Sequence, residues 1–111
     1  MTDYSTSMRT DRCGDLRADD VDRSVTLCGW VDRRREHGEH LAFIDLRDRS
    51  GVVQLVIDGA HDLRSEYVLQ VTGNVRLRPN DTANQALPTG AIEIDVAEVT
   101  ILSTSDPLPF P

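Results

Sequence analysis

A chain of 111 residues with 39% hydrophobic and 28% charged residues can form one domain around one core, and this composition excludes a disordered or membrane-embedded protein. No apolar run approaches the roughly 20 residues that cross a bilayer, and the polar N-terminus has no secretory signal, so we expect a cytoplasmic protein without a membrane partner. The net charge of −7 argues against a protein that grips nucleic acid over its whole surface, although all 12 basic residues are arginines, whose planar guanidinium suits phosphates and bases.

The sequence offers few residues in the patterns that are typical of metal sites or catalytic sites. The spacing of Cys13 and Cys28 fits neither a zinc site nor a redox pair, so we expect buried, reduced thiols. The 3 histidines have no cysteine or carboxylate cluster at metal-ligand spacing, which predicts no metal site. There is no glycine-rich phosphate loop and no nucleophile elbow, and acids such as Asp45 and Asp48 are interpreted as solvated charges. We therefore expect no catalytic residue in this chain.

Five segments have the two-residue alternation that is typical of β-strands. Residues 1–10 are polar and are expected to be flexible, and residues 14–21 could hold a short helical turn. The predicted strands then follow at residues 25–35, 41–47, 52–57, 67–78 and 91–102.

Glycines and changes of alternation predict where these strands bend. Gly29 and Gly73 lie inside the first and fourth strands, which indicates a bulge or a sharp bend. In the fifth strand the apolar alternation changes phase, which indicates a bulge near Ala97 or Glu98. Gly51 ends a tight turn at a position where a hairpin needs a positive φ.

The remaining segments are short connections. Residues 58–66 leave room for about a turn and a half of helix, and residues 79–90 read as a polar loop. Five strands with almost no helix predict an all-β protein: a five-stranded OB-fold barrel of Greek-key topology with a short N-terminal helical turn. An SH3-like barrel is the alternative.

Phe43 and Gln54 do not fit the pattern of their strands. Phe43 alternates with Asp45 and Arg47, so it lies on the polar face of its strand. On an OB-fold such a ring can stack on an unpaired base, whereas the alternative is a ring covered by a neighbouring element. Gln54 is an amide within an apolar strand, where it either reads a base edge or is simply exposed.

Arginines and one acid form a second set of candidates. The consecutive Arg33, Arg34 and Arg35 could neutralise phosphates while one of them reads a base, or they could be a solvated strand end. Arg76 and Arg78 alternate on one face of the fourth strand and could extend this basic strip. Glu93 could accept a hydrogen bond from a cytosine amino group, or it could be an ordinary outward-facing charge.

The amino-acid sequence resembles that of the N-terminal domain of bacterial aspartyl-tRNA synthetases. The motifs GWVxRRR and FIDLRDRxG separate this family from the lysyl and asparaginyl relatives, which share the barrel. The resemblance covers nearly everything from Met8 to Pro111 and is carried by residues 25–38, 43–54, 64–67, 71–76, 88–93 and 107–110.

The resemblance implies an OB-fold that binds a tRNA anticodon. The position matching Phe43 stacks on an anticodon base in that family, and those matching Arg35, Gln54 and Glu93 contact anticodon nucleotides. His37 resembles members that charge both tRNA-Asp and tRNA-Asn, so the implied partner is the tRNA-Asp anticodon loop, with tRNA-Asn considered as a second.

A division of the chain follows from the same resemblance. We expect a flexible segment at residues 1–10, the anticodon-binding OB-fold at residues 11–103 and the start of a linker at residues 104–111. The catalytic domain of an aspartate–tRNA ligase would lie elsewhere, would bind ATP, Mg²⁺ and aspartate, and would form a homodimer. Two alternatives stay open, namely a free-standing single-strand nucleic-acid binder and a protein-interaction barrel.

Overall fold

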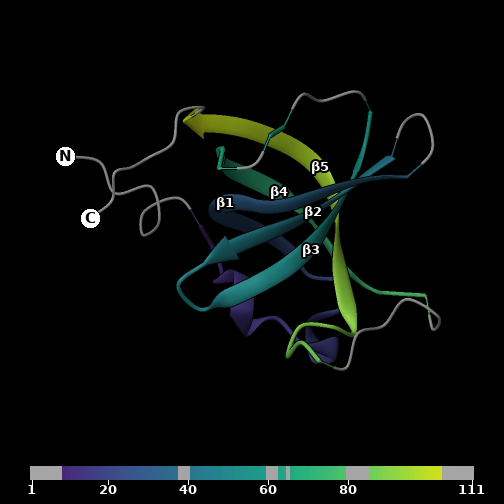
Figure 1. The fold of residues 1–111 in the computed structure, drawn as a ribbon. Coiled ribbons are helices and arrows are strands. Elements are labelled where there is room, and N and C mark those ends of the chain that lie inside the picture. The colour runs from purple at the N-terminus through teal and green to yellow at the C-terminus, as the bar shows by residue number, and fades with distance from the viewer. Residues whose placement is uncertain (1–8, 38–40, 60–62, 65, 80–85, 104–111) are drawn as a thin grey trace.

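The computed structural model describes residues 9–37, 41–59, 63–64, 66–79 and 86–103 (Figure 1). Two 3₁₀ turns precede five strands, and these elements are η1 (Cys13–Asp15), η2 (Ala18–Asp20), β1 (Ser24–His37), β2 (Leu41–Asp48), β3 (Gly51–Asp58), β4 (Val68–Leu77) and β5 (Ile92–Ser103). Almost all of the expected flexible N-terminal segment, and all of the expected linker, lie outside the described residues. No helix in the described ranges is long and apolar enough to cross a bilayer.

The five strands form a closed barrel in the order β1-β2-β3-β5-β4. All neighbours are antiparallel except β3 and β5, which run parallel and pair Leu55 with Ile94 and Val56 with Asp95. The predicted all-β class and the five-stranded barrel are confirmed, and the expected helical turn forms as the two short 3₁₀ turns. Figure 1 shows both turns along the underside of the barrel.

β1 closes the barrel because it pairs with two different strands. Its first half, Ser24 to Trp30, pairs with β4, and its second half, from Trp30 onwards, pairs with β2. Gly29 lies at the change of partner, where a side chain would meet the backbone of Arg47 on β2. Gly29 therefore permits a close crossing of two strands.

Bulges shift the register at positions that matter for side-chain direction. On β5, Thr72 pairs with Glu98 and Gly73 pairs with Val96, so Ala97 is the extra residue, as predicted. On β1 the pairing shifts between Val31 and Arg33, so Asp32 is the extra residue, three positions after Gly29, where the sequence indicated a bulge or a bend. Gly51 has a φ of 144°, in agreement with the predicted turn.

The inward faces of all five strands supply one core. The core side chains that are at most 2% exposed include Leu27, Ile44, Leu55 and Ile94. Leu63, from the segment between β3 and β4 where the sequence left room for a short helix, also packs into this core, and Tyr67 of the same segment packs against it.

Both cysteines are buried, as expected, and no disulfide joins them. Burial raises the pKa of the Cys13 thiol far above its usual value, and the nearby Asp48 carboxylate acts in the same direction. Burial also raises the pKa of Cys28. Neither thiol is therefore activated as a nucleophile.

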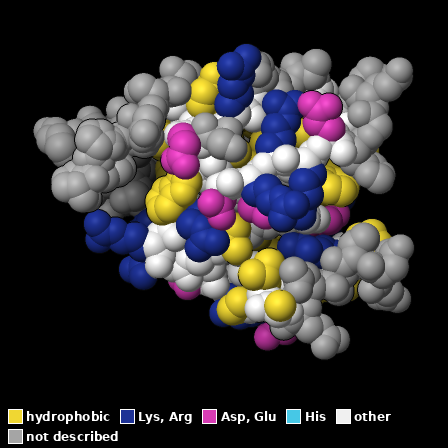
Figure 2. Space-filling model, in the orientation of Figure 1, with side chains coloured by type: hydrophobic (Ala, Val, Ile, Leu, Met, Phe, Trp, Pro, Cys, Tyr) yellow, Lys and Arg dark blue, Asp and Glu magenta, His cyan; other side chains and the backbone are white. Residues whose placement is uncertain are grey.

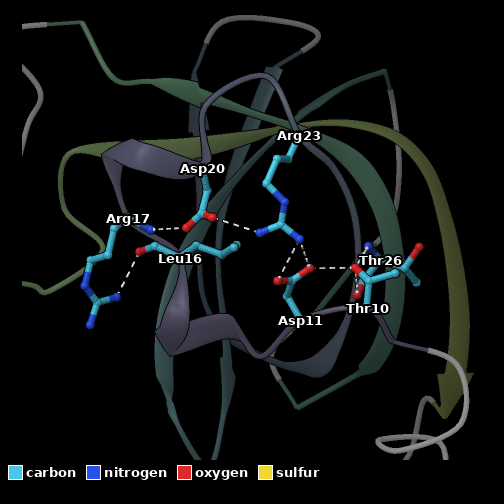
Figure 3. Close-up of polar contacts among 7 residues, drawn as sticks. All are labelled: Thr10, Asp11, Leu16, Arg17, Asp20, Arg23 and Thr26. Carbon is cyan, nitrogen blue, oxygen red and sulfur yellow. Dashed lines mark hydrogen bonds and ion pairs between the residues drawn. The ribbon is translucent and has the colours of Figure 1, made fainter.

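Polar contacts hold the N-terminal segment to the barrel (Figure 3). The Thr10 N–H donates to the Thr26 carbonyl at 2.8 Å, and the Thr26 N–H donates back to Thr10 Oγ1 at 2.9 Å. Arg23 bridges Asp11 at 3.0 Å and Asp20 at 2.8 Å. These contacts hold Thr10 and Asp11 against the start of β1.

Asp48 fastens the same segment to the β2–β3 turn. Its Oδ2 accepts from the Cys13 N–H at 2.9 Å, and its Oδ1 accepts from the Ser50 N–H at 2.8 Å. Gly14 N–H donates to Ser50 Oγ at 2.7 Å. The interpretation of Asp48 as a solvated charge is therefore wrong, because this carboxylate satisfies backbone donors of η1 and of its own turn.

These contacts predict that the attachment of η1 to the β2–β3 turn weakens in acid. Burial raises the pKa of the Asp48 carboxyl, but the hydrogen bonds from Ser50 and Cys13 outweigh burial and hold this pKa below its usual value. A carboxyl with a depressed folded-state pKa stabilises the fold above its unfolded-state pKa of about 3.9, and this stabilisation is lost as the pH falls through the folded value. We expect Asp48→Asn to lower the free energy of unfolding by about 2 kcal/mol at pH 7.

Urea denaturation of both proteins at pH 7 and at about pH 2.5 measures this effect. The difference between wild type and Asp48→Asn should shrink at the lower pH to the extent that the Asp48 carboxyl becomes protonated in the folded state. A difference that is equally large at both pH values would show that the charge of Asp48 contributes nothing.

Candidate nucleic-acid interface

The outer face of β1, β2 and β3 carries the predicted aromatic and two of the predicted arginines. Cross-strand pairing places Arg35 beside Phe43, and Phe43 beside Val56. One step along the strands, Arg33 lies beside Asp45. Because neighbours in register project from the same side of a sheet, these side chains share a face.

Phe43 lies on the outside of the barrel. Its neighbours along β2, Ala42 and Ile44, are buried, whereas Phe43 is partly exposed and is not a member of the core cluster. The outward direction that the alternation predicted for this ring is therefore confirmed, while its role in stacking stays a prediction.

A row of hydrogen-bonded polar side chains crosses this face. Arg35 Nη2 donates to Asp45 Oδ1 at 3.1 Å and to Gln54 Oε1 at 3.0 Å. Gln54 Nε2 donates to Glu93 Oε1 at 3.0 Å, and Arg76 Nε donates to Glu93 Oε2 at 2.8 Å. The structure thus joins four predicted site residues from four strands in one network, which includes Asp45 as a fifth member.

Gln54 and Glu93 are buried within this row, at 6% and 5% exposure. A cation on one side and an anion on the other fix the orientation of the Gln54 amide, with Oε1 toward Arg35 and Nε2 toward Glu93. An amide has a second lone pair and a second N–H, and among the described residues each end of Gln54 has one bonding position without a partner. The alternative in which Gln54 and Glu93 are ordinary exposed residues is wrong.

Arg78 lies directly after β4 and is 8% exposed. Its Nε donates to the Ile92 carbonyl at 3.0 Å. Burial lowers the pKa of the Arg78 guanidinium, and the carboxylates of Glu93 and Asp45 act in the opposite direction. Arg78 therefore adds a buried positive charge beside the network.

Arg34 is separated from its two neighbours. It pairs with Ile44, which faces the core, and its Nη1 donates to the Leu63 carbonyl at 3.2 Å. This side chain ties β1 to the segment that carries Leu63. Its position gives no support to the predicted contact with nucleic acid, which the shared face does give to Arg33 and Arg35.

His37 ends β1, and its side chain lies outside the described part of the structure. Asp45 and Asp95 were missed as members of the site, since Asp45 was interpreted as solvated. In the structure the Asp45 side chain is only 22% exposed, and Asp95 pairs with Arg76 Nη1 at 3.5 Å. The alternation of Asp45 with Phe43 and that of Asp95 with Glu93 were the signals that could have found them.

The surface of this face is mixed in charge. In Figure 2, arginine, acidic and hydrophobic side chains lie next to one another over β1, β2 and β3 and do not form separate areas. Across the described residues, no three His, Cys, Asp or Glu side chains gather to hold a metal ion. The expectation that the chain has no metal site stays a prediction.

A closed five-stranded barrel with a polar and aromatic face on its second and third strands defines the OB-fold class. The chain belongs to the tRNA anti-codon family, described as an OB-fold nucleic acid binding domain, whose family model matches residues 25–102. The family expected from the sequence is therefore confirmed.

Curated relatives are similar over nearly the whole chain. It is 55% identical over 106 residues to the aspartate–tRNA(Asp/Asn) ligase of Pseudarthrobacter chlorophenolicus, an alignment that covers 93% of this chain and 18% of the relative. Identity to the enzyme of the same name from Kineococcus radiotolerans is 51% over 110 residues, again covering 93% of this chain and 18% of the relative. The chain thus spans about 18% of the length of these relatives.

The aspartyl tRNA synthetase from Entamoeba histolytica has a similar structure. Its TM-score is 0.76 at 19% sequence identity, over 96% of this chain and 24% of that one. The TM-score shows that the two share the barrel fold, and at an identity this low the likeness shows the fold alone.

Proposed function

We propose that this chain is the anticodon-binding part of an aspartate–tRNA ligase and that the outer face of β1, β2 and β3 binds the anticodon loop of tRNA-Asp. The observation that carries the proposal is the position of Phe43, an aromatic ring on the outside of the barrel and next to the Arg35–Gln54–Glu93 row. Membership of the family and the identity to aspartate–tRNA(Asp/Asn) ligases support the same reading.

Recognition rests on stacking and on base-edge contacts. An anticodon base stacks on the Phe43 ring. The unused lone pair and N–H of Gln54 meet the edge of a neighbouring base, and the network holds that amide in one orientation before the RNA arrives. Arg33 and Arg35 contact phosphates, which fix the register of the loop.

The chain does not itself perform the ligase reaction. It positions the distant acceptor end of the tRNA for a catalytic domain elsewhere in the whole protein, and that domain binds ATP and Mg²⁺ and forms a homodimer. The relatives' name includes both tRNA-Asp and tRNA-Asn, and this supports acceptance of tRNA-Asn as a second partner. A cytoplasmic location agrees with this role.

The test is a titration of an anticodon stem-loop hairpin of tRNA-Asp with Phe43 variants. We expect Phe43→Ala to weaken binding by about 10-fold or more, because stacking on an aromatic ring contributes roughly 1–3 kcal/mol per base. Phe43→Tyr keeps the aromatic face and should bind within about 3-fold of wild type. Fluorescence anisotropy at fixed low salt measures all three affinities.

Phe43→Leu is the control for loss of packing, because it keeps an apolar side chain and removes the ring. It should bind as weakly as the alanine variant if stacking is the main contact. Equal binding of all four proteins would contradict the proposal. Binding of any single strand without preference for the anticodon would favour the free-standing binder, and no RNA binding at low salt would favour the protein-interaction barrel.

A further inference from the structure

Arginines on the RNA-facing side of the barrel are paired with acids. Arg47 Nε contacts Asp32 Oδ2 at 3.0 Å, and Arg76 Nη1 contacts Asp95 Oδ2 at 3.5 Å. Arg35 has Asp45 as its partner at 3.1 Å. The mixed colouring of this face in Figure 2 agrees with these pairs.

Asp32 and Asp95 differ from the other acids of the face because they are exposed. Their side chains are 42% and 55% exposed, and Glu93 is 6% exposed by the same measure. Ion pairs between exposed side chains contribute little to folding stability, since water and salt screen them. Their effect on an incoming polyanion is larger, because each carboxylate both occupies a guanidinium and repels phosphate.

We propose that Asp32 and Asp95 set the RNA selectivity of this face by suppressing binding to the phosphates of any single strand. Affinity that is independent of sequence grows with the number of phosphates that free cations neutralise. Because Arg47 and Arg76 are paired with acids, the phosphates of a single-stranded RNA alone contribute little to its affinity. An RNA then binds well only if its bases also make the contacts at Phe43 and Gln54.

The inference rests on the proposed function, since it takes this face to be the RNA-binding surface. It assigns to Asp32 and Asp95 a role opposite to that of a contact residue, because their removal should strengthen binding. Asparagine has nearly the same shape as aspartate, so Asp32→Asn and Asp95→Asn remove the charge and leave the backbone and the packing as they are.

The experiment compares two hairpins on the 111-residue chain. One is the anticodon stem-loop of tRNA-Asp, and the other has the same stem with all three anticodon bases replaced. The double variant Asp32→Asn/Asp95→Asn should bind the changed hairpin about 10-fold more tightly than wild type and the cognate hairpin only about 3-fold more tightly. The slope of log affinity against log salt should steepen by about 0.7 for each further phosphate that is neutralised. Arg76 keeps Glu93 as a partner in the double variant, so most of this change is expected from Arg47.

Asp19→Asn is the matched control for net charge. Asp19 is exposed on η2, and it forms no ion pair with another described residue. The control should leave both affinities within about 1.5-fold of wild type. Thermal melting checks that every variant is folded.

Two outcomes distinguish failure of this inference from failure of the proposed function. If wild type binds both hairpins equally, the proposed anticodon recognition fails and the selectivity role of Asp32 and Asp95 fails with it, even where their variants bind RNA more tightly. If wild type prefers the cognate hairpin but these variants bind the changed hairpin no better than Asp19→Asn does, the inference is wrong and the proposed function stands.

Discussion

Replacing Gly29 with alanine is expected to lower the free energy of unfolding by about 3 kcal/mol or more. β1 changes its partner from β4 to β2 beside this residue, and an added Cβ would meet the carbonyl oxygen and carbon of Arg47. Those are backbone atoms of β2, so no side-chain rotation relieves the overlap. The strands would have to separate where the barrel closes.

Urea denaturation measures the loss, and Thr100→Ala is the control. Thr100 is exposed on β5, so its replacement should change stability by no more than about 0.5 kcal/mol. If Gly29→Ala unfolds within about 1 kcal/mol of wild type, β1 can move away from β2 and the crossing is not the tight point of the barrel.

The sequence predicted those features that depend on neighbours along the chain. Alternation identified all five strands to within a few residues, and the phase change in the fifth strand located the bulge at Ala97. Gly51 was assigned a positive φ because it ends a tight turn. The outward direction of Phe43 follows from the same rule, since its neighbours Ala42 and Ile44 are buried.

The direction of the arginines on β1 could not be predicted in this way. Continued alternation from Val31 would have pointed Arg33 and Arg35 into the core and Arg34 outwards. The extra residue on β1 between Val31 and Arg33 reverses this order, because a bulge shifts every later side chain to the other face. Gly29 indicated a bulge or a bend three residues earlier, but no apolar phase change marks Asp32 as the extra residue.

The buried polar network was also beyond sequence reasoning. Gln54 and Glu93 are 39 residues apart and meet only because β3 and β5 run parallel and adjacent. Each was noticed as a polar residue in an apolar strand, but nothing local indicated that one would be the partner of the other. Long-range pairing of this kind depends on barrel closure, which residue spacing does not encode.

The network makes Glu93 the acid whose loss should matter most. Its carboxylate accepts from Gln54 at 3.0 Å and from Arg76 at 2.8 Å, and it faces the buried Arg78. We expect Glu93→Ala to lower the free energy of unfolding by about 3 kcal/mol, because removing one partner of a buried charged group leaves the others unpaired. Because the Arg76 side chain is 45% exposed, it can turn toward water when Glu93 is removed. The decrease in the free energy of unfolding therefore stays at the lower end of the range for broken buried pairs.

Two variants separate the charge of Glu93 from its shape. Glu93→Gln keeps one acceptor oxygen but turns an NH₂ group toward a donor, so it should cost about 1–2 kcal/mol. Asp95→Asn removes an exposed acid two residues along β5 and should cost no more than about 1 kcal/mol. Urea denaturation of the three variants in parallel ranks them by their free energy of unfolding. If Glu93→Ala proves no less stable than Asp95→Asn, the buried row does not depend on its carboxylate, and the fixed orientation of Gln54 would need another cause.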